Sequence, residues 1–241
     1  MFIGHYGVAL AAKRASPRLS LGLLFLAVQA LDVLFALFVL LGIEKLRIVH
    51  RFTAYNPYDL YRMPYSHSLL GALGWSLLAG ISYWAVARRD PERGRAVAAT
   101  VLGAAVFSHF VLDVPMHTKD LPLGFGPSSP KIGLGLWNYP VASIAAELAV
   151  FLAGWIIYVR ATRAASRGYA LGTAVFGAVL LLVLFATPFQ PDPPGARAFA
   201  VTALVLYAAL ALAAGYVDRG RRTLELHSRS RYERTGSAPT V

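Results

Sequence analysis

Six apolar runs, each about as long as a bilayer is thick, constrain this 241-residue chain more than any other feature. A helix needs roughly 20 apolar residues to cross the hydrocarbon core of a membrane. Charged residues make up 15% of the chain, whereas a soluble domain carries about 25%. The sequence therefore predicts an all-α, polytopic transmembrane bundle in residues 1–217. Its expected spans are residues 19–43, 66–87, 96–114, 136–159, 168–189 and 198–217.

The distribution of basic residues predicts the orientation of the bundle. Of the 23 Lys and Arg residues, 16 lie in the N-terminal segment, loops 88–95 and 160–167, and the tail 218–241. Because basic loops stay on the cytoplasmic side, both termini are expected in the cytoplasm. The first run is too long for a signal peptide and lacks a small-residue cleavage site, so it is expected to be a retained helix. The basic tail 218–241 is predicted to be mobile, because it lacks hydrophobic periodicity.

Composition also excludes several classes of function. The net charge of +11 comes from short clusters between apolar runs, without a long basic face. Nucleic-acid binding is therefore not expected, and the lipid bilayer is the expected partner. The chain has no cysteine, which excludes disulfides, Cys-based zinc sites and iron–sulfur clusters.

Residues 1–14 are apolar but too short to cross a membrane, and two interpretations fit them. They could form an amphipathic helix on the membrane surface. Alternatively, they could form a re-entrant half-helix that dips in from the cytoplasmic face, anchored by Lys13 and Arg14. Re-entrant backbone is tolerated only where it packs within protein. Length and apolarity alone do not choose between the two.

Several ionisable residues lie within or beside the predicted spans, where a charge costs several kcal/mol and so suggests function. At about 1.5 Å of rise per residue, all of them fall between the midplane and the outer rim. His109 and Asp113 are four residues apart and therefore share one helical face. Pro115 is expected to end this helix, which would leave His117 off that face. The residues concerned are Asp32, His67, His109, Asp113 and Glu147.

Imidazole and carboxylate groups together are the ligands that Zn²⁺ and related divalent ions use in proteins. The cluster therefore indicates a metal or proton site, although each residue also has a structural interpretation. Asp32 could pair with Gln29 or a loop arginine, and His67 could lie at the interface behind an N-cap at Ser66. Glu147 could neutralise a buried histidine. Two further histidines, His50 and His227, lie in polar segments and are expected to be solvated.

The order of these residues resembles the bacterial inner-membrane family of YdjM-like proteins, described as metal-dependent hydrolases. That family has a Gly-His start, an Asp-rich first helix, a Thr-His-Ser-Leu-Leu motif and a Ser-His-(x)3-Asp motif. The corresponding elements are Gly4-His5, Asp32, Ser66-His67-Ser68-Leu69-Leu70 and Ser108-His109-x-x-x-Asp113. The resemblance covers residues 4–120. It implies a bacterial inner-membrane location, adds His5 to the candidate ligands and favours a dipping N-terminal segment.

One departure from the family pattern bears on the number of metal ions. The family's first helix ends in a Pro-Asp-x-Asp-His-like string, whereas here Asp32 is followed by Val33, Leu34 and Phe35. This difference argues for one metal ion rather than two.

The sequence thus leads to one hypothesis and two alternatives. One divalent ion, preferably zinc, is held by His67, His109 and Asp113, with Asp32 and His5 as further ligands or supporting partners. Glu147 or an uncoordinated Asp32 acts as general base. The metal-activated water then cleaves an amphipathic or lipid-linked ester or phosphoester. The alternatives are a transporter or proton relay that uses the same cluster, and a non-catalytic structural subunit.

Overall fold

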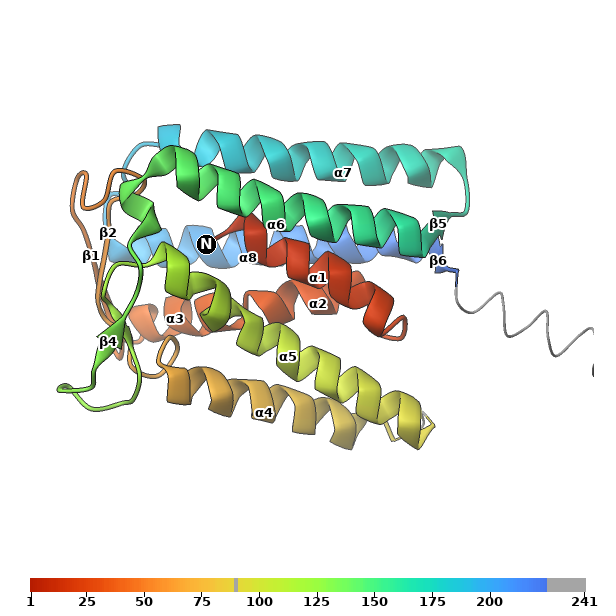
Figure 1. Cartoon of the computed structure of the whole chain (residues 1–241), viewed down its shortest axis with the longest axis horizontal. Helices are drawn as coiled ribbons and strands as arrows, with labels where there is room; N and C mark the ends of the chain where they lie inside the picture. Colours follow the sequence, from red (N-terminus) through yellow and green to blue (C-terminus); the bar gives the residue numbers. More distant parts are fainter. Residues whose placement is uncertain (89–90, 225–241) are drawn as a thin grey trace, which may run out of the picture.

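The computed structural model describes residues 1–88 and 91–224, and 66% of the chain is helical. Five of its helices are long and apolar enough to span a membrane, or six spans if a bent helix pair counts as one. The predicted all-α bundle is confirmed (Figure 1). Within the described residues the helices are α1 Ile3–Ala15, α2 Leu21–Val28, α3 Ala30–Leu40, α4 Leu69–Val86, α5 Glu92–Met116, α6 Pro140–Ala161, α7 Arg167–Ala186 and α8 Ala196–Arg219.

Short antiparallel strand pairs occupy the two ends of the bundle (Figure 1). At one end, β1 (Lys45–Ile48) pairs with β2 (Tyr58–Arg62) and β3 (Leu121–Pro122) pairs with β4 (Lys131–Ile132). At the other end, β5 (Thr162–Ala164) pairs with β6 (Arg221–Thr223). Two 3₁₀ turns, η1 (Leu136–Asn138) and η2 (Thr187–Phe189), precede α6 and follow α7.

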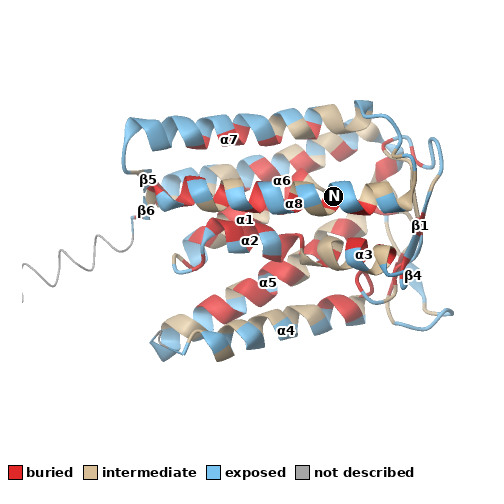
Figure 2. Cartoon of the chain, turned by 180° about the vertical axis from the view of Figure 1, so that it is seen from behind, coloured by how far each residue is buried: buried red, intermediate tan, exposed pale blue. Residues whose placement is uncertain are grey.

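The outward-facing side chains are largely apolar, as expected of a bundle surrounded by lipid. Helix α4 shows this most clearly, since it packs chiefly against α5 and buries only 11% of its span (Figure 2). Its exposed side chains include Leu77 and Ile81, which are 64% and 63% exposed. A soluble monomer rarely leaves so large an apolar surface uncovered.

The first predicted span is not one continuous helix. Helices α2 and α3 meet at Gln29 with a bend of 57°. Backbone torsions of φ −105° and ψ 8° at Gln29 end α2 there. At this bend the carbonyl oxygen of Val28 lies 2.7 Å from Nδ1 of His109 on α5. The break therefore coincides with a backbone contact to one of the candidate ligands.

Helix α1 lies inside the bundle, as the dipping interpretation predicts and the surface interpretation does not. It runs along α6 and also contacts α2 and α5. A Cβ atom at Gly154 would lie 1.9 Å from the carbonyl oxygen of Gly7, so the glycines allow the two backbones to touch. The side chains of His5, Tyr6 and Leu10 are completely buried.

The ordered structure continues beyond the predicted domain boundary at residue 217. Helix α8 extends to Arg219, β6 then pairs with β5, and the side chain of Asp218 is buried. Residues 218–224 of the predicted mobile tail are thus part of the bundle. The remainder of that tail, including His227, lies outside the described residues.

Candidate metal site

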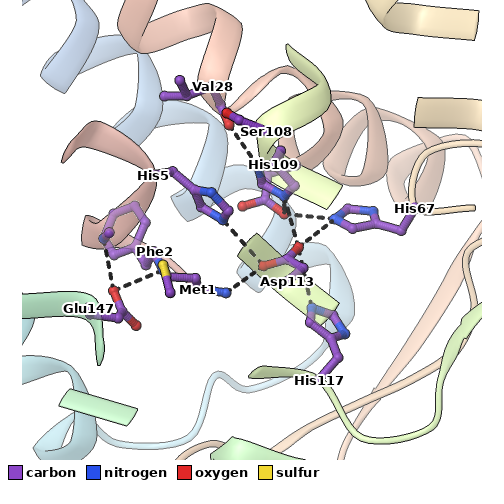
Figure 3. A network of polar contacts seen from close by, with 12 residues as sticks. Met1, Phe2, His5, Val28, His67, Ser108, His109, Asp113, His117 and Glu147 are labelled. Atoms are coloured by element: carbon purple, nitrogen blue, oxygen red, sulfur yellow. Dashed lines mark hydrogen bonds and ion pairs between the residues drawn. The ribbon is translucent and has the colours of Figure 1, made fainter. Parts of the chain in front are cut away.

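The five predicted metal ligands come together at the end of the bundle that carries β1–β4 (Figures 1 and 3). Helices α1, α3 and α5 supply His5, Asp32 and the pair His109 and Asp113, and the segment before α4 supplies His67. Apart from Asp32, these side chains are at most 2% exposed. Residues separated by more than 100 positions therefore share one polar cluster in an apolar interior.

Asp113 lies at the centre of this cluster. Its Oδ2 atom lies 3.1 Å from Nε2 of His109 and 3.8 Å from Nε2 of His67. Its Oδ1 atom lies 3.3 Å from Nε2 of His5. The α-ammonium nitrogen of Met1 is 2.6 Å from the same Oδ1 atom (Figure 3). Both oxygens of this carboxylate thus face nitrogen atoms.

Asp32 faces the same histidines from the opposite side. Its Oδ1 atom lies 3.3 Å from Nε2 of His67 and 3.5 Å from Nε2 of His109. Charge-assisted hydrogen bonds are shorter, at about 2.7–2.9 Å. Two zinc ligands lie about 3.4 Å apart, because each sits about 2.0–2.1 Å from the ion at a tetrahedral angle. The spacing of these atoms is therefore that of ligands around a shared cation.

The hydrogen-bond partner of Nδ1 shows which nitrogen of the neutral His109 ring carries the hydrogen. Nδ1 of His109 contacts the carbonyl oxygen of Val28 at 2.7 Å, and a carbonyl can only accept. In the neutral ring Nδ1 therefore carries the hydrogen and Nε2 carries the lone pair. That lone pair faces carboxylate oxygens of Asp32 and Asp113. A cation bound at Nε2, whether a proton or a metal ion, compensates the charge of these two carboxylates.

Unpartnered polar atoms support the same conclusion. Both ring nitrogens of His5 and Nε2 of His109 are buried without a hydrogen-bond partner in the described part of the chain. The two rings stack at a centroid distance of 3.9 Å. Leaving such a group unsatisfied costs about 1–3 kcal/mol. The residues thus fit a metal ion, which would accept the free nitrogen lone pairs and compensate the carboxylate charge.

Two overlapping sets of residues have their ligand atoms within 4.8 Å of one another. One set contains His5, His109 and Asp113, and the other contains Asp32, His67 and His109. Since Nε2 of His109 can bind only one ion, the shared residue favours a single ion near His109. This agrees with the one-ion hypothesis from the sequence.

Asp32 is the most exposed residue of the candidate ligand set. Its side chain is 22% exposed, whereas Phe35, about one turn later in α3, is buried. Its second oxygen, Oδ2, accepts a hydrogen bond of 3.0 Å from the hydroxyl of Tyr207 on α8. Asp32 is thus held in place at the most exposed part of the cluster.

His117 also faces the cluster, and the prediction that Pro115 would end the helix before it was wrong. Helix α5 continues through Pro115 to Met116, and Nε2 of His117 lies 3.4 Å from Oδ2 of Asp113. Its Nδ1 atom contacts Asp120 at 3.0 Å. Burial lowers the pKa of His117, but the carboxylates of Asp113 and Asp120 outweigh it and raise the pKa above its ordinary value. The regular spacing of residues 109, 113 and 117 was the available sequence signal.

Glu147 occupies a different position from the one its candidate role as general base requires. Its Oε2 atom accepts hydrogen bonds from the backbone N–H groups of Phe2, at 3.0 Å, and Gly4, at 3.1 Å. A carboxylate at this place caps α1 and compensates the positive end of the helix dipole. Glu147 belongs to neither set of potential metal ligands. The geometry therefore favours a role in holding α1, and with it His5, against α6.

No family model, curated protein or solved structure matches this chain.

Proposed function

We propose that the protein is a membrane-embedded, metal-dependent hydrolase. One divalent ion, preferably zinc, is held by Asp32, His67, His109 and Asp113, with His5 supporting them from α1. The observation that carries this proposal is the convergence of histidine Nε2 atoms on two carboxylates at ligand-to-ligand distances. The motif-level resemblance to YdjM-like proteins agrees with it.

The residues around the ion have separable tasks in this proposal. A divalent ion acts as a Lewis acid and would lower the pKa of a bound water molecule to about 7. Asp32 is the most exposed of these residues, and we propose that the carboxylate oxygen not bound to the ion accepts a proton from a water molecule beside it. Asp113 is buried among the histidines and supplies negative charge that holds the ion. The surrounding apolar side chains exclude competing water.

The surroundings of the site suggest the substrate class and location. The cluster lies between helices whose exposed side chains include many large apolar residues, near one end of the bundle (Figure 1). An amphipathic or lipid-linked ester or phosphoester could reach such a site from the bilayer. The excess of Lys and Arg in loops at the opposite end supports a cytoplasmic location for that end, which carries Lys13, Arg14 and the C-terminal end of α8, whereas Met1 itself lies within the bundle beside Asp113. The site then faces the outer leaflet.

Transport through the same cluster is the second candidate, and the bend at Gln29 favours it. Transporters often bind their cargo where spanning helices are broken. A transporter would move ions across vesicle membranes without hydrolysing any ester. A hydrolase would release product from a panel of phospholipids and lipid-linked phosphates, and would lose this activity with its metal.

The metal content of detergent-purified protein tests the proposed site. His109→Ala is expected to lose most of the bound metal, because one of few ligands is removed from a buried site. The matched control is His50→Ala, since His50 is 75% exposed and contacts only Asp192 among the polar contacts described. Elemental analysis should find the control as loaded as the wild type. Equal metal content in both variants would refute the site.

A further inference from the structure

Glu44, in the segment between α3 and β1, is a buried acid outside the candidate ligand set. Its side chain is 1% exposed. Oε1 accepts hydrogen bonds from the backbone N–H groups of Tyr65, at 2.7 Å, and Ser66, at 2.9 Å. Oε2 accepts a hydrogen bond of 2.5 Å from the hydroxyl of Ser66. All of these contacts are to the segment that immediately precedes His67.

The Ser66 hydroxyl connects this carboxylate to the site. Ser66 Oγ lies 2.8 Å from Nδ1 of His67. Because the hydroxyl hydrogen is donated to Glu44, Oγ offers only lone pairs to the ring. Nδ1 of His67 must therefore carry the hydrogen, and Nε2 keeps its lone pair. That lone pair faces Asp32 and Asp113, at 3.3 and 3.8 Å.

We infer that Glu44 is a positioning residue which acts through Ser66 to hold His67 in the tautomer that binds a metal ion. This inference rests on the proposed metal site. Histidine ligands commonly donate their second N–H to a carboxylate or carbonyl, which fixes the ring and its tautomer. His109 uses the carbonyl of Val28 in this way. For His67 a serine hydroxyl is inserted between ring and carboxylate.

Glu44→Gln reverses the direction of this relay while preserving the shape of the side chain. The amide oxygen can still accept from the two backbone N–H groups, so the amide NH₂ group faces Ser66 and must donate to Oγ. The Ser66 hydroxyl then donates to Nδ1 of His67, and the ring hydrogen moves to Nε2. Affinity for Zn²⁺ should fall by about 10- to 100-fold, the usual effect of losing such an outer partner.

A double variant separates this role from simple support of the turn. Adding Ser66→Ala to Glu44→Gln removes the reversed donor, so Nε2 of His67 can again offer its lone pair. The double variant should therefore bind Zn²⁺ more tightly than Glu44→Gln alone. If Glu44 only supports the turn at residues 65–66, the second substitution should bring no recovery. An affinity equal to or lower than that of Glu44→Gln would overturn the inference.

The tautomer can be read directly by ¹⁵N NMR of the histidine rings in metal-free protein, with a His67→Gln variant to identify the signal. The wild type should carry the His67 hydrogen on Nδ1, and Glu44→Gln should carry it on Nε2. An unchanged tautomer would overturn the inference. If Glu44→Gln does not fold, Ser66→Ala alone should still show a mixture of both tautomers. A His67 hydrogen that stays fully on Nδ1 would overturn the inference.

A wild type without affinity for Zn²⁺ would instead refute the proposed function, and the tautomer measurement would still decide the role of Glu44.

Discussion

Helix α1 contacts a buried charged cluster at each end, and the two clusters differ in how completely their polar atoms are satisfied. Near its C-terminus, Lys13 Nζ contacts Asp218 at 2.6 Å and the carbonyl of Leu19 at 2.8 Å. Asp218 also accepts hydrogen bonds from the N–H of Leu21 and the hydroxyl of Tyr158, both at 3.1 Å. Near the N-terminus, Nε2 of His5 and Nε2 of His109 face Asp113, but neither these atoms nor Nδ1 of His5 has a hydrogen-bond partner among the described residues.

The difference shows that buried charge alone does not identify a functional site. The Lys13–Asp218 cluster contains a cation, an anion and matching hydrogen bonds, so it is complete without a ligand. The cluster around Asp113 contains a cation in the α-ammonium group of Met1, but buried ring nitrogens of His5 and His109 have no hydrogen-bond partner among the described residues. Among these two clusters, only the second leaves ligand atoms that an ion from outside the chain could bind. Three substitutions test this contrast.

Asp218→Ala should have the largest effect on stability. Removing one partner of a buried ion pair costs about 3–5 kcal/mol, because the other charge stays buried and unpaired. The matched control is Asp59→Ala, whose partner Arg47 is 64% exposed, and it should cost at most about 1 kcal/mol. Unfolding in detergent measures both. Because the Lys13–Asp218 cluster is separate from the proposed metal site, Asp218→Ala should keep its metal content. Loss of metal from the folded variant would contradict this distinction between the two clusters.

Gly154→Ala should affect both clusters, because α1 connects them. The new Cβ would lie 1.9 Å from the backbone oxygen of Gly7, so α1 has to move. Overpacking of this kind costs about 1–3 kcal/mol. Displacement of His5 should also lower metal affinity in a titration. Gly172→Ala on α7 is the control, because its Cβ meets nothing within 4 Å. Equal stability and equal metal affinity in the two variants would show that neither property depends on the position of α1.

Glu147→Gln should have the smallest effect and distinguishes a helix cap from a general base. Loss of the charge at the start of α1 should lower stability by about 1 kcal/mol. Metal content and turnover should be retained, because Glu147 contacts backbone N–H groups rather than the ligand set. Loss of a general base would instead reduce turnover by about 100-fold or more. A rate loss of that size without a change in stability would restore Glu147 as the base.

Much of the candidate site could be predicted from the sequence because the membrane makes ionisable residues conspicuous. His109 and Asp113 were placed together by helical spacing, and Asp32 and His67 by estimated depth. Two other features could not be found in this way. Glu44 lies in a polar loop, where an acidic residue is common and does not indicate a functional site. His117 follows a proline, and a proline usually ends a helix. His117 reaches the cluster because α5 continues past Pro115 to Met116.

By itself, the sequence determined the class of the protein, because runs of about 20 apolar residues are stable as helices in a bilayer. It also determined the residue types available for a metal site, since an ionisable group within a span needs a partner. The tertiary structure alone decided which groups those partners are. The bend at Gln29, the burial of α1 along α6 and the contacts of Glu44 depend on packing between segments distant in the chain. Helical spacing constrains neighbours within one helix, whereas hydrogen-bond partners across the bundle are set by how the helices pack.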